Sequence, residues 1–560
     1  MTPISRSALA AALILTAGPA LADPPRTTPT QGSSYGQFLA GRFALNTGDG
    51  ENASRYLSAA LAGSQGEQLT RERAFSAALL AGDVATAASV PLDPAQSQAS
   101  LVEAGRLAQA VQALIDGRAR TAYRELQTRP IGAPHARAGA LISRWLAAEA
   151  GDWNAAVEEP APTADALTQI FTSYHRAQLL ERRRRFDEAE ALYRQLLMDG
   201  NAAPLFRLPY GEFLERRRRR DDAVAVYDEG LAQGADLELS AARARAAAGE
   251  RAPELIGVRE GAAQALYQAA SAAIVAQAYE YAVAYLRFAL ALDPTDTESW
   301  VVLGQALDQI GLKNAARDAW AQTPPGSPAY VEARVQLALS LEDAGQGEEA
   351  VRVAREAAAL GIAEGATAFT LAGLLNSQER YREALEVLDG PALGEVATDW
   401  RVHFLRGAAH ERLGEYDQAE AAFQQALVLE PNSPEILNYL GYLWIDRGVR
   451  VDDGLAMVER AVAAEPGNGA YVDSLGWGRY RQGRHAEAVT LLERAVSLDS
   501  SSATINDHLG DAYWRVGRER EARYQWNRVL TMDPDPELRS EVEAKLAGGL
   551  DPVMAHVGEP

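Results

Sequence analysis

The sequence LGWGRYRQGRHAEAVTLLERAVSLD at 475–499 is followed by LGDAYWRVGREREARYQWNRVLTMD at 509–533. The two stretches begin 34 residues apart and share a Leu-Gly pair, a glycine, an alanine and a large apolar residue at matching positions. After the Leu-Gly pair, the matched residues are Gly483 and Gly517, Ala488 and Ala522, and Leu492 and Trp526. The same skeleton can be followed back through most of the chain. A fixed period of this length indicates a repeat protein, whose function is sought on a surface rather than in a catalytic pocket.

The unit at 297–330 shows how one period is predicted to fold. Leu303 and Leu307 are four residues apart, so they belong to one stripe of a first helix. Gly311 ends this helix, and Ala316 and Trp320 form the matching stripe of a second helix. Two helices alone cannot bury both stripes. Each unit must therefore stack on the next, and stability becomes roughly a sum of interfaces between neighbours.

This pattern resembles the tetratricopeptide repeat (TPR), a helix-turn-helix unit of 34 residues. The resemblance rests on the period, on a small residue about 12 places after the Leu-Gly pair, and on a proline or turn residue near the end of each unit. The turn residues are Pro431, Pro466, Ser500 and Pro534. The resemblance implies an all-α, superhelical TPR solenoid of about 13–14 repeats. No alternating apolar-polar run is long enough to predict a sheet.

The repeats vary in clarity along the chain, which predicts its organisation. The clearest units lie in the second half, whereas the pairs at 68–92, 98–130 and 135–158 are degenerate and a single extra helix is expected near 237–248. The predicted parts are a signal peptide at 1–22, a disordered mature N-terminus at 23–33, a degenerate TPR-like array at 34–250, a C-terminal TPR array at 259–536, a capping helix at 537–547 and a disordered tail at 548–560.

The first 22 residues have the three-part order of a secretory signal peptide. Arg6 precedes an apolar run at 8–17, and the small residues Ala20 and Ala22 precede Asp23. We expect cleavage between Ala22 and Asp23 and a periplasmic protein. No later segment reaches 18 apolar residues, so no transmembrane segment is predicted. The chain has no cysteine, which excludes disulfide and thiol chemistry and a lipid anchor on cysteine.

Composition and motifs point away from nucleic acid and from catalysis. A formal net charge of −22 repels the phosphate backbone, so general nucleic-acid binding is not expected. The seven histidines form no H-E-x-x-H motif, and neither a G-x-S-x-G elbow nor a phosphate-binding loop is present. We therefore predict a protein that is not an enzyme and that holds no metal and no cofactor.

Two arginine runs interrupt the acidic character of the chain. They lie at 182–185 and 216–220, 34 residues apart, each in the predicted turn between the helices of a unit. Stacking should bring them together on one edge that could dock an acidic protein surface, phospholipid headgroups or a cell-wall polymer. The alternative is a solvated edge on which neighbouring acidic residues, such as Glu188 and Asp222, neutralise the arginines. The members of this basic edge are Arg182, Arg183, Arg184, Arg185, Arg216, Arg217, Arg218, Arg219 and Arg220.

The last hundred residues carry more than the generic repeat requires. The sequences NYLGY at 438–442, YVDSLGW at 471–477 and INDHLGDAYW at 505–514, with EAR at 521–523 and QW at 525–526, resemble a proteobacterial family of exported repeat proteins. That family includes an outer-membrane lipoprotein adaptor that binds a periplasmic carboxyl-terminal processing protease and helps it degrade peptidoglycan cross-link hydrolases. The resemblance is specific from about 400 to 535. The chain departs from the adaptor in lacking the lipidation cysteine.

Polar and aromatic side chains between the packing stripes of these first helices are predicted to line a concave groove. Carboxylates, an amide and flat rings on successive helices would suit an extended peptide. The alternative is that Trp477 and Trp514 complete contacts with neighbouring helices and that Asp473 and Asp507 satisfy the starts of their helices. The candidate groove residues are Asn438, Tyr442, Asp473, Trp477, Asp507, Asp511 and Trp514.

Two classes of function follow from the sequence. The first is a periplasmic scaffold that recruits a carboxyl-terminal processing protease or its peptidoglycan hydrolase substrates. The second is a structural component of an envelope or polysaccharide-secretion assembly. Both require protein partners, and co-purification would distinguish them.

Overall fold

In the computed structural model the described residues are 33–63, 67–160, 165–198, 200, 202–234, 236–361 and 364–550. Within these ranges the chain is helical and contains no strand, so the predicted all-α fold is confirmed. Contacts divide the chain into two compact units, Arg26–Ala344 and Gly345–Pro560. The predicted signal peptide at 1–22, all but the last residue of 23–33, and the tail from 551 onward lie outside the described residues.

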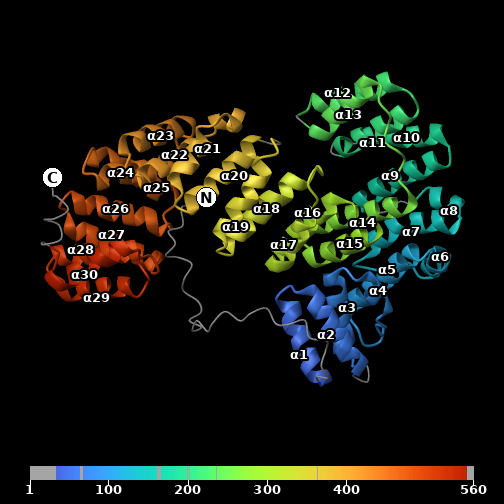
Figure 1. Cartoon of the computed structure of the whole chain (residues 1–560), viewed down its shortest axis with the longest axis horizontal. Helices are drawn as coiled ribbons and strands as arrows, with labels where there is room; N and C mark the ends of the chain where they lie inside the picture. The colour runs from blue at the N-terminus through green and yellow to red at the C-terminus, as the bar shows by residue number, and fades with distance from the viewer. Residues whose placement is uncertain are drawn as a thin grey trace. The chain divides into compact units, whose positions relative to one another are not determined.

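The unit Arg26–Ala344 contains helices α1 to α18 (Figure 1). Their bounds are α1 Ser34–Asn46, α2 Gly50–Gly63, α3 Gln68–Ala81, α4 Val84–Ser89, α5 Ala99–Ile115, α6 Ala119–Thr128, α7 Ala136–Ala150, α8 Trp153–Val157, α9 Ala166–Arg182, α10 Phe186–Leu197, α11 Ala203–Arg216, α12 Arg220–Leu231, α13 Leu237–Ala248, α14 Val258–Val275, α15 Tyr279–Leu292, α16 Thr297–Gln309, α17 Lys313–Ala321 and α18 Tyr330–Asp343.

The unit Gly345–Pro560 contains helices α19 to α30 and one 3₁₀ segment, η2. Their bounds are α19 Gly347–Ala358, α20 Glu364–Ser377, α21 Tyr381–Leu388, η2 Pro391–Thr398, α22 Trp400–Arg412, α23 Tyr416–Leu429, α24 Pro434–Asp446, α25 Val451–Ala464, α26 Gly469–Arg481, α27 His485–Leu498, α28 Ala503–Arg515, α29 Glu519–Leu530 and α30 Pro536–Gly548.

In several repeats a large side chain covers a glycine of the facing helix. In the pair α16 and α17, a Cβ atom on Gly304 would lie only 2.2 Å from Trp320 Nε1, and Trp320 donates a hydrogen bond to the carbonyl of Val301. The residue 16 positions after the glycine plays the same part elsewhere, in the pairs Gly211 and Tyr227, Gly407 and Phe423, Gly476 and Leu492, and Gly510 and Trp526. The ring can approach because glycine has no side chain.

The turn between the two helices of a repeat requires a left-handed residue. Gly311, Gly483 and Gly517 occupy this position with φ of 81°, 76° and 80°. In the two repeats that carry the arginine runs, the same position is filled by Arg184 and Arg218, with φ of 58° and 61°. These two arginines therefore share one backbone setting, one repeat apart.

Helices α14 and α15 depart from nearest-neighbour stacking. They follow α13 in the chain but pack against α5, α7 and α9 (Figure 1). His135 Nδ1 lies 2.7 Å from the hydroxyl of Tyr285, and Gln178 Nε2 donates to Gln264 Oε1 at 3.0 Å. Gly261 of α14 lies directly against the ring of Trp145. The small residues of α14 allow this close packing, which leaves α10 to α13 stacked in order on α9 as a side branch.

The sequence placed the division between the two arrays near 250–258, whereas the contacts divide the chain between Ala344 and Gly345. The reason is the return of α14 and α15, which binds the later repeats of the first unit to its earliest ones. The stretch 249–257 is then a crossing segment from α13 to α14 rather than a linker between domains.

The last helix, α30, packs on α29 at the end of the second unit. Its bounds, Pro536–Gly548, coincide closely with the predicted capping helix at 537–547. The predicted tail begins at 548, but its first residues are packed: Leu550 is fully buried, and Gly549 lies against the ring of Trp514. Apolar contact therefore extends the ordered end of the unit past the helix.

Candidate functional site

The two arginine runs meet in the first unit, as the 34-residue spacing predicts. Arg216, at the end of α11, donates two hydrogen bonds to Glu181, at the end of α9, with distances of 2.8 Å from Nε to Oε1 and 3.0 Å from Nη2 to Oε2. Glu181 is 5% exposed, and the Arg216 side chain is 16% exposed. This paired geometry fixes the two turns beside each other.

Several arginines of the basic edge are used within the fold. Arg185 pairs with Glu188 at 2.6 Å, and Arg219 pairs with Glu190 at 2.8 Å and with Asp222 at 2.7 Å. The acidic residues after each run therefore neutralise part of the edge. These exposed pairs contribute little to folding.

Two other arginines hold the crossing segment. Arg182 donates to the carbonyl of Ile256 at 2.5 Å, and Arg220 donates to the carbonyl of Gly249 at 2.7 Å. The guanidinium of Arg183 lies 5.1 Å from the ring centre of Trp153. A purely solvated edge does not account for these contacts.

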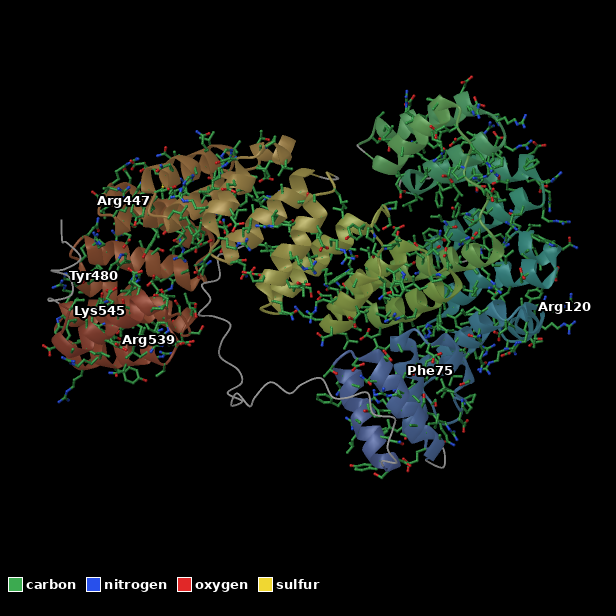
Figure 2. All side chains as sticks on the ribbon, viewed as in Figure 1. Phe75, Arg120, Arg447, Tyr480, Arg539 and Lys545 are labelled. Carbon is green, nitrogen blue, oxygen red and sulfur yellow. The ribbon has the colours of Figure 1, made fainter. Side chains whose placement is uncertain are left out.

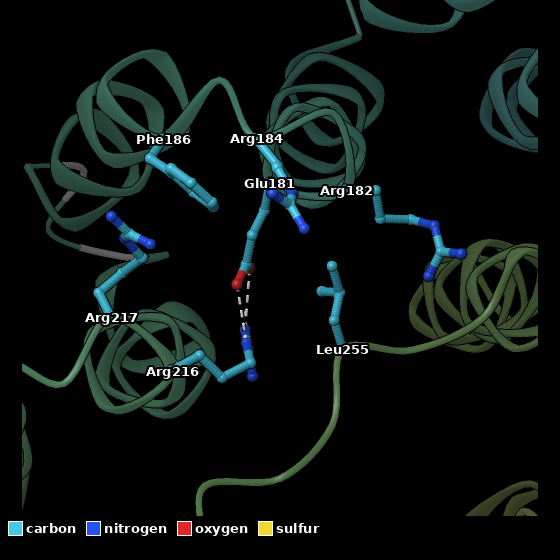
Figure 3. Close-up of a pocket in the computed structure, with 7 residues that line it drawn as sticks. All are labelled: Glu181, Arg182, Arg184, Phe186, Arg216, Arg217 and Leu255. Atoms are coloured by element: carbon cyan, nitrogen blue, oxygen red, sulfur yellow. Dashed lines mark hydrogen bonds and ion pairs between the residues drawn. The ribbon is translucent and has the colours of Figure 1, made fainter.

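A cavity of about 360 Å³ opens where the two turns and the crossing segment face one another (Figure 3). Its lining residues are Glu181, Arg182, Arg184, Phe186, Arg216, Arg217 and Leu255. We call this cavity the arginine pocket. The guanidinium of Arg217 lies 3.6 Å from the ring centre of Phe186, so the ring holds this cation in place.

The arginine pocket carries an excess of positive charge. Arg184 and Arg217 are exposed, and neither forms an ion pair with any residue that the structure describes. Arg218 is also exposed and has no ion-pair partner within the described ranges, but it does not line the pocket. The arginine pocket is thus a small cationic cavity, which can accept the oxygens of an anionic group.

The candidate groove residues of the second unit lie in a different setting from the one that the sequence predicts. Asn438, Asp473 and Trp477 are 8%, 5% and 7% exposed, and Asp507 and Asp511 are 5% and 2% exposed. The prediction that their side chains face an open groove is wrong. The physical reason is that each carboxylate has a buried cation beside it.

Lys545 of α30 supplies one of these cations. Its ammonium group lies 2.8 Å from Asp507 Oδ2 and 2.9 Å from Asp511 Oδ2 on α28, and 2.8 Å from Glu541 Oε1 on its own helix. Lys545 lies near Tyr480 at the end of the unit (Figure 2). The three carboxylates are close enough together to hold a metal ion, but the ammonium group already lies within hydrogen-bonding distance of all three.

His508 supplies the other cation. Its Nδ1 lies 3.0 Å from Asp473 Oδ2, and its ring stacks on Trp477 with 4.1 Å between centres. Burial lowers the pKa of His508, but Asp473, with Asp507 and Asp511, outweighs this effect and raises the pKa to about 9. His508 is therefore charged at neutral pH.

The pKa values of the neighbouring carboxyl groups of Asp507 and Asp511 are raised as well, which favours their neutral forms. Burial, reinforced by Asp507, raises the pKa of Asp511 to about 7 against the opposing effect of Lys545. Burial also raises the pKa of Asp507. Each carboxyl group thus resists ionisation, although the ammonium group beside it favours the ionised form.

The remaining groove candidates take part in packing. Trp477 stacks on Tyr480 and donates a hydrogen bond to Asp446 at 3.3 Å. Trp514 is half-buried against Trp526, with 5.4 Å between ring centres. Tyr442 is half-buried beside the same apolar cluster. The packing interpretation of the two tryptophans is confirmed.

Some site residues escaped the sequence-based reasoning. Glu181 comes directly before the first arginine run, and Glu215 comes before the second, where it pairs with Arg245 at 2.7 Å. A glutamate at this repeated position was the signal for a buried pair. For Lys545 the signal was rarity, because the chain has only one other lysine, Lys313, among 54 basic residues.

Comparison with known proteins agrees with the repeat architecture. Models described as tetratricopeptide repeat match residues 174–238 and 400–433, and a model described as TPR repeat matches residues 479–517. The first of these stretches contains both arginine runs.

A TPR repeat-containing protein of Pseudomonas aeruginosa is 25% identical over 187 residues, which are 33% of this chain and 31% of the relative. The match therefore spans less than a third of that relative's length.

Two solved structures are among those to which this chain is similar. A tetratricopeptide repeat protein from Parabacteroides merdae is 17% identical, with a TM-score of 0.39 over 44% of this chain and 96% of that chain. The APC/C hetero-tetramer Cut9-Hcn1 is 14% identical, with a TM-score of 0.38 over 93% of this chain and 97% of that chain. The family matches, together with the helix pairs, show tetratricopeptide repeats at 174–238, 400–433 and 479–517 within an all-helical repeat fold.

Proposed function

We propose that this protein is a non-enzymatic periplasmic scaffold that binds other proteins through its repeats. The main support for this proposal is the succession of tetratricopeptide repeats. The family models match residues 400–433 and 479–517, and the helices from α22 to α29 form the corresponding pairs. Stacked repeats of this kind present an extended surface to a partner and leave the scaffold itself rigid. Tetratricopeptide repeats thus imply a scaffold for protein–protein interaction.

The proposed location rests on the N-terminal sequence. Arg6, the apolar run at 8–17 and the small residues before Asp23 have the order of a cleavable signal. Among the described residues, no helix has the length and apolar character needed to cross a bilayer. We propose export to the periplasm, with a mature chain that begins at Asp23.

The proposed partners rest on the resemblance of residues 400–535 to an adaptor family. They are a carboxyl-terminal processing protease and the peptidoglycan hydrolases that it degrades. The scaffold would hold protease and substrate together, which raises the effective concentration of one near the other.

Recovery of the protein with its partners tests the proposal. The full-length chain, tagged after residue 560, is expressed in its own organism, released by osmotic shock and crosslinked before purification. We expect the N-terminal sequence to begin at Asp23 and mass spectrometry to identify the protease or a hydrolase. An intact residue 1 would rule out cleavage, and recovery of polysaccharide-secretion subunits instead would favour a structural role in an envelope assembly.

A reconstituted reaction then tests the adaptor role. The purified protease is mixed with the purified hydrolase, with and without the scaffold, and loss of the hydrolase is followed over time. We expect faster degradation when the scaffold is present, with a maximum at equal concentrations, because excess scaffold separates the two partners. An unchanged rate would contradict the adaptor role.

A further inference from the structure

The arginine pocket lacks the carboxylates that would balance its charge. Glu181 is the one acidic residue of its lining, and both oxygens of this side chain already accept hydrogen bonds from Arg216. Arg184 and Arg217 remain without an ion-pair partner in the described part of the chain. The pocket therefore presents two free guanidinium groups in a concave setting.

The pocket is held in shape before any ligand arrives. The Glu181–Arg216 pair joins α9 to α11, and Arg182 fixes the crossing segment through the carbonyl of Ile256. Arg217 rests on the ring of Phe186. A cavity whose walls are already fixed loses little conformational entropy on binding.

The lining combines cations with apolar surface. Phe186 and Leu255 form walls beside the guanidinium groups of Arg184 and Arg217 (Figure 3). A guanidinium can hold a carboxylate through two parallel hydrogen bonds, and the apolar walls can cover a neighbouring aliphatic side chain. A peptide segment that alternates acidic and apolar residues matches both features.

Size and net charge decide among anionic partners. A cavity of about 360 Å³ accommodates a few side chains rather than an extended polyanion. The formal net charge of −22 repels nucleic acid and anionic membranes, whereas a short segment brings few charges into this field. We propose that the arginine pocket binds an acidic, leucine-containing segment of a partner protein. This inference rests on the proposed scaffold function and adds the place and the chemistry of contact.

The probe for this proposal is a fluorescein-labelled peptide of alternating glutamate and leucine. Its matched control has glutamine in place of glutamate. Fluorescence anisotropy with the full-length protein is expected to show saturable binding of the glutamate peptide, weakened by added salt, and no binding of the glutamine peptide. Equal binding of the two peptides would overturn the proposal.

Matched substitutions locate the binding. Arg184→Gln and Arg218→Gln remove exposed arginines from equivalent left-handed turn positions, but only Arg184 lines the pocket. Arg184→Gln and Arg217→Gln each remove one charge-assisted contact. We expect each variant to bind the peptide about tenfold more weakly, or weaker still. Arg218→Gln should bind as the natural protein does. Equal losses at Arg184 and Arg218 would overturn the assignment to the pocket.

Two further measurements separate peptide from other anions. Inorganic phosphate should compete only in large excess, and phosphatidylglycerol vesicles should not sediment the protein. If the protein binds vesicles through Arg184 and Arg217 but does not bind the peptide, the proposal that the ligand is a peptide is wrong. If the peptide fails to bind while the protein still captures partners from the periplasm, the pocket assignment fails and the scaffold function stands. If the peptide binds as expected but no partner is captured, the scaffold function fails instead.

Discussion

The ammonium group of Lys545 on α30 lies 2.8 Å from Asp507 Oδ2 on α28, and both side chains are buried. The final helix is therefore attached to the last repeat by an ion pair as well as by apolar contacts. Removing one partner of such a pair leaves a buried, uncompensated charge, and this costs more than the intact pair contributes.

Substitution of Lys545 should detach the last helix. We expect Lys545→Ala to destabilise α28 to α30 by about 3–5 kcal/mol, because Asp507 and Asp511 are left buried without their cation. Native-state hydrogen exchange of the amides in these helices measures the local change. The matched control is Lys313→Ala, since Lys313 is half-exposed and lies 3.2 Å from the exposed Asp343. It should cost no more than about 1 kcal/mol, and similar costs for the two lysines would contradict the assignment.

The stability of the C-terminal repeats should depend on pH through His508. Its folded pKa of about 9 exceeds the ordinary value of 6.5, so its stabilising contribution is complete below pH 6.5 and is lost as the pH rises through 9. The difference between the two values corresponds to at most about 3 kcal/mol. The raised pKa of Asp511 acts in the same direction below pH 7, because the folded state then binds more protons than the unfolded chain.

Exchange rates in α26 to α30, measured from pH 6 to pH 10, check this dependence after correction for intrinsic exchange. In His508→Gln the decline above pH 6.5 should be smaller, and the two proteins should approach the same stability above pH 9. A parallel decline in both proteins would show that other groups are responsible.

Trp526 is predicted to be a main packing residue of the last repeat. It is fully buried, covers Gly510 and donates a hydrogen bond to Asp511 at 3.0 Å. Trp526→Ala should cost about 3–5 kcal/mol, as expected for a large buried side chain. Tyr524→Ala serves as the control on the same helix, since Tyr524 is 67% exposed and its removal should change stability little. Thermal and urea unfolding of both variants give the comparison.

The two kinds of arginine in the second run should behave differently on substitution. Arg216→Gln should destabilise α9 and α11 by about 3 kcal/mol, because Glu181 is left buried without a partner. Arg218→Gln should leave stability unchanged, since this side chain is exposed and unpaired within the described ranges. Hydrogen exchange in α9 and α11 measures both effects. If hydrogen exchange is unchanged in Arg216→Gln, the interpretation of the whole run as a solvated surface would be correct instead.

Local features of the fold could be predicted from the sequence because they follow from the residue types at fixed positions of the repeat. The glycine and apolar residue 16 positions apart, such as Gly304 and Trp320, mark the crossing of two helices. Helix α13 at Leu237–Ala248 lies where the sequence places a single extra helix, at 237–248. Each of these features depends only on residues within about one period.

Contacts beyond one period could not be predicted in the same way. The repeat spacing does not predict that Tyr285 lies beside His135, because the units between them are irregular. The contact depends on α14, whose small residues allow it to pack closely against α7. The carboxylates of Asp473 and Asp507 occupy positions that face a groove in a generic repeat. Their cations, His508 and Lys545, have no counterpart one period away, so only the three-dimensional structure shows that these charges are buried.

The packing of α14 on α7 has a consequence for the order of folding. In a simple solenoid each repeat can fold on the previous one as it leaves the ribosome. Here the contact between His135 and Tyr285 closes a loop of 150 residues. The ring of Trp145 is covered by Gly261 only when α14 has packed against α7. Until Gly261 is in place, the ring of Trp145 lacks the cover that α14 provides, so the first unit closes as a whole rather than repeat by repeat.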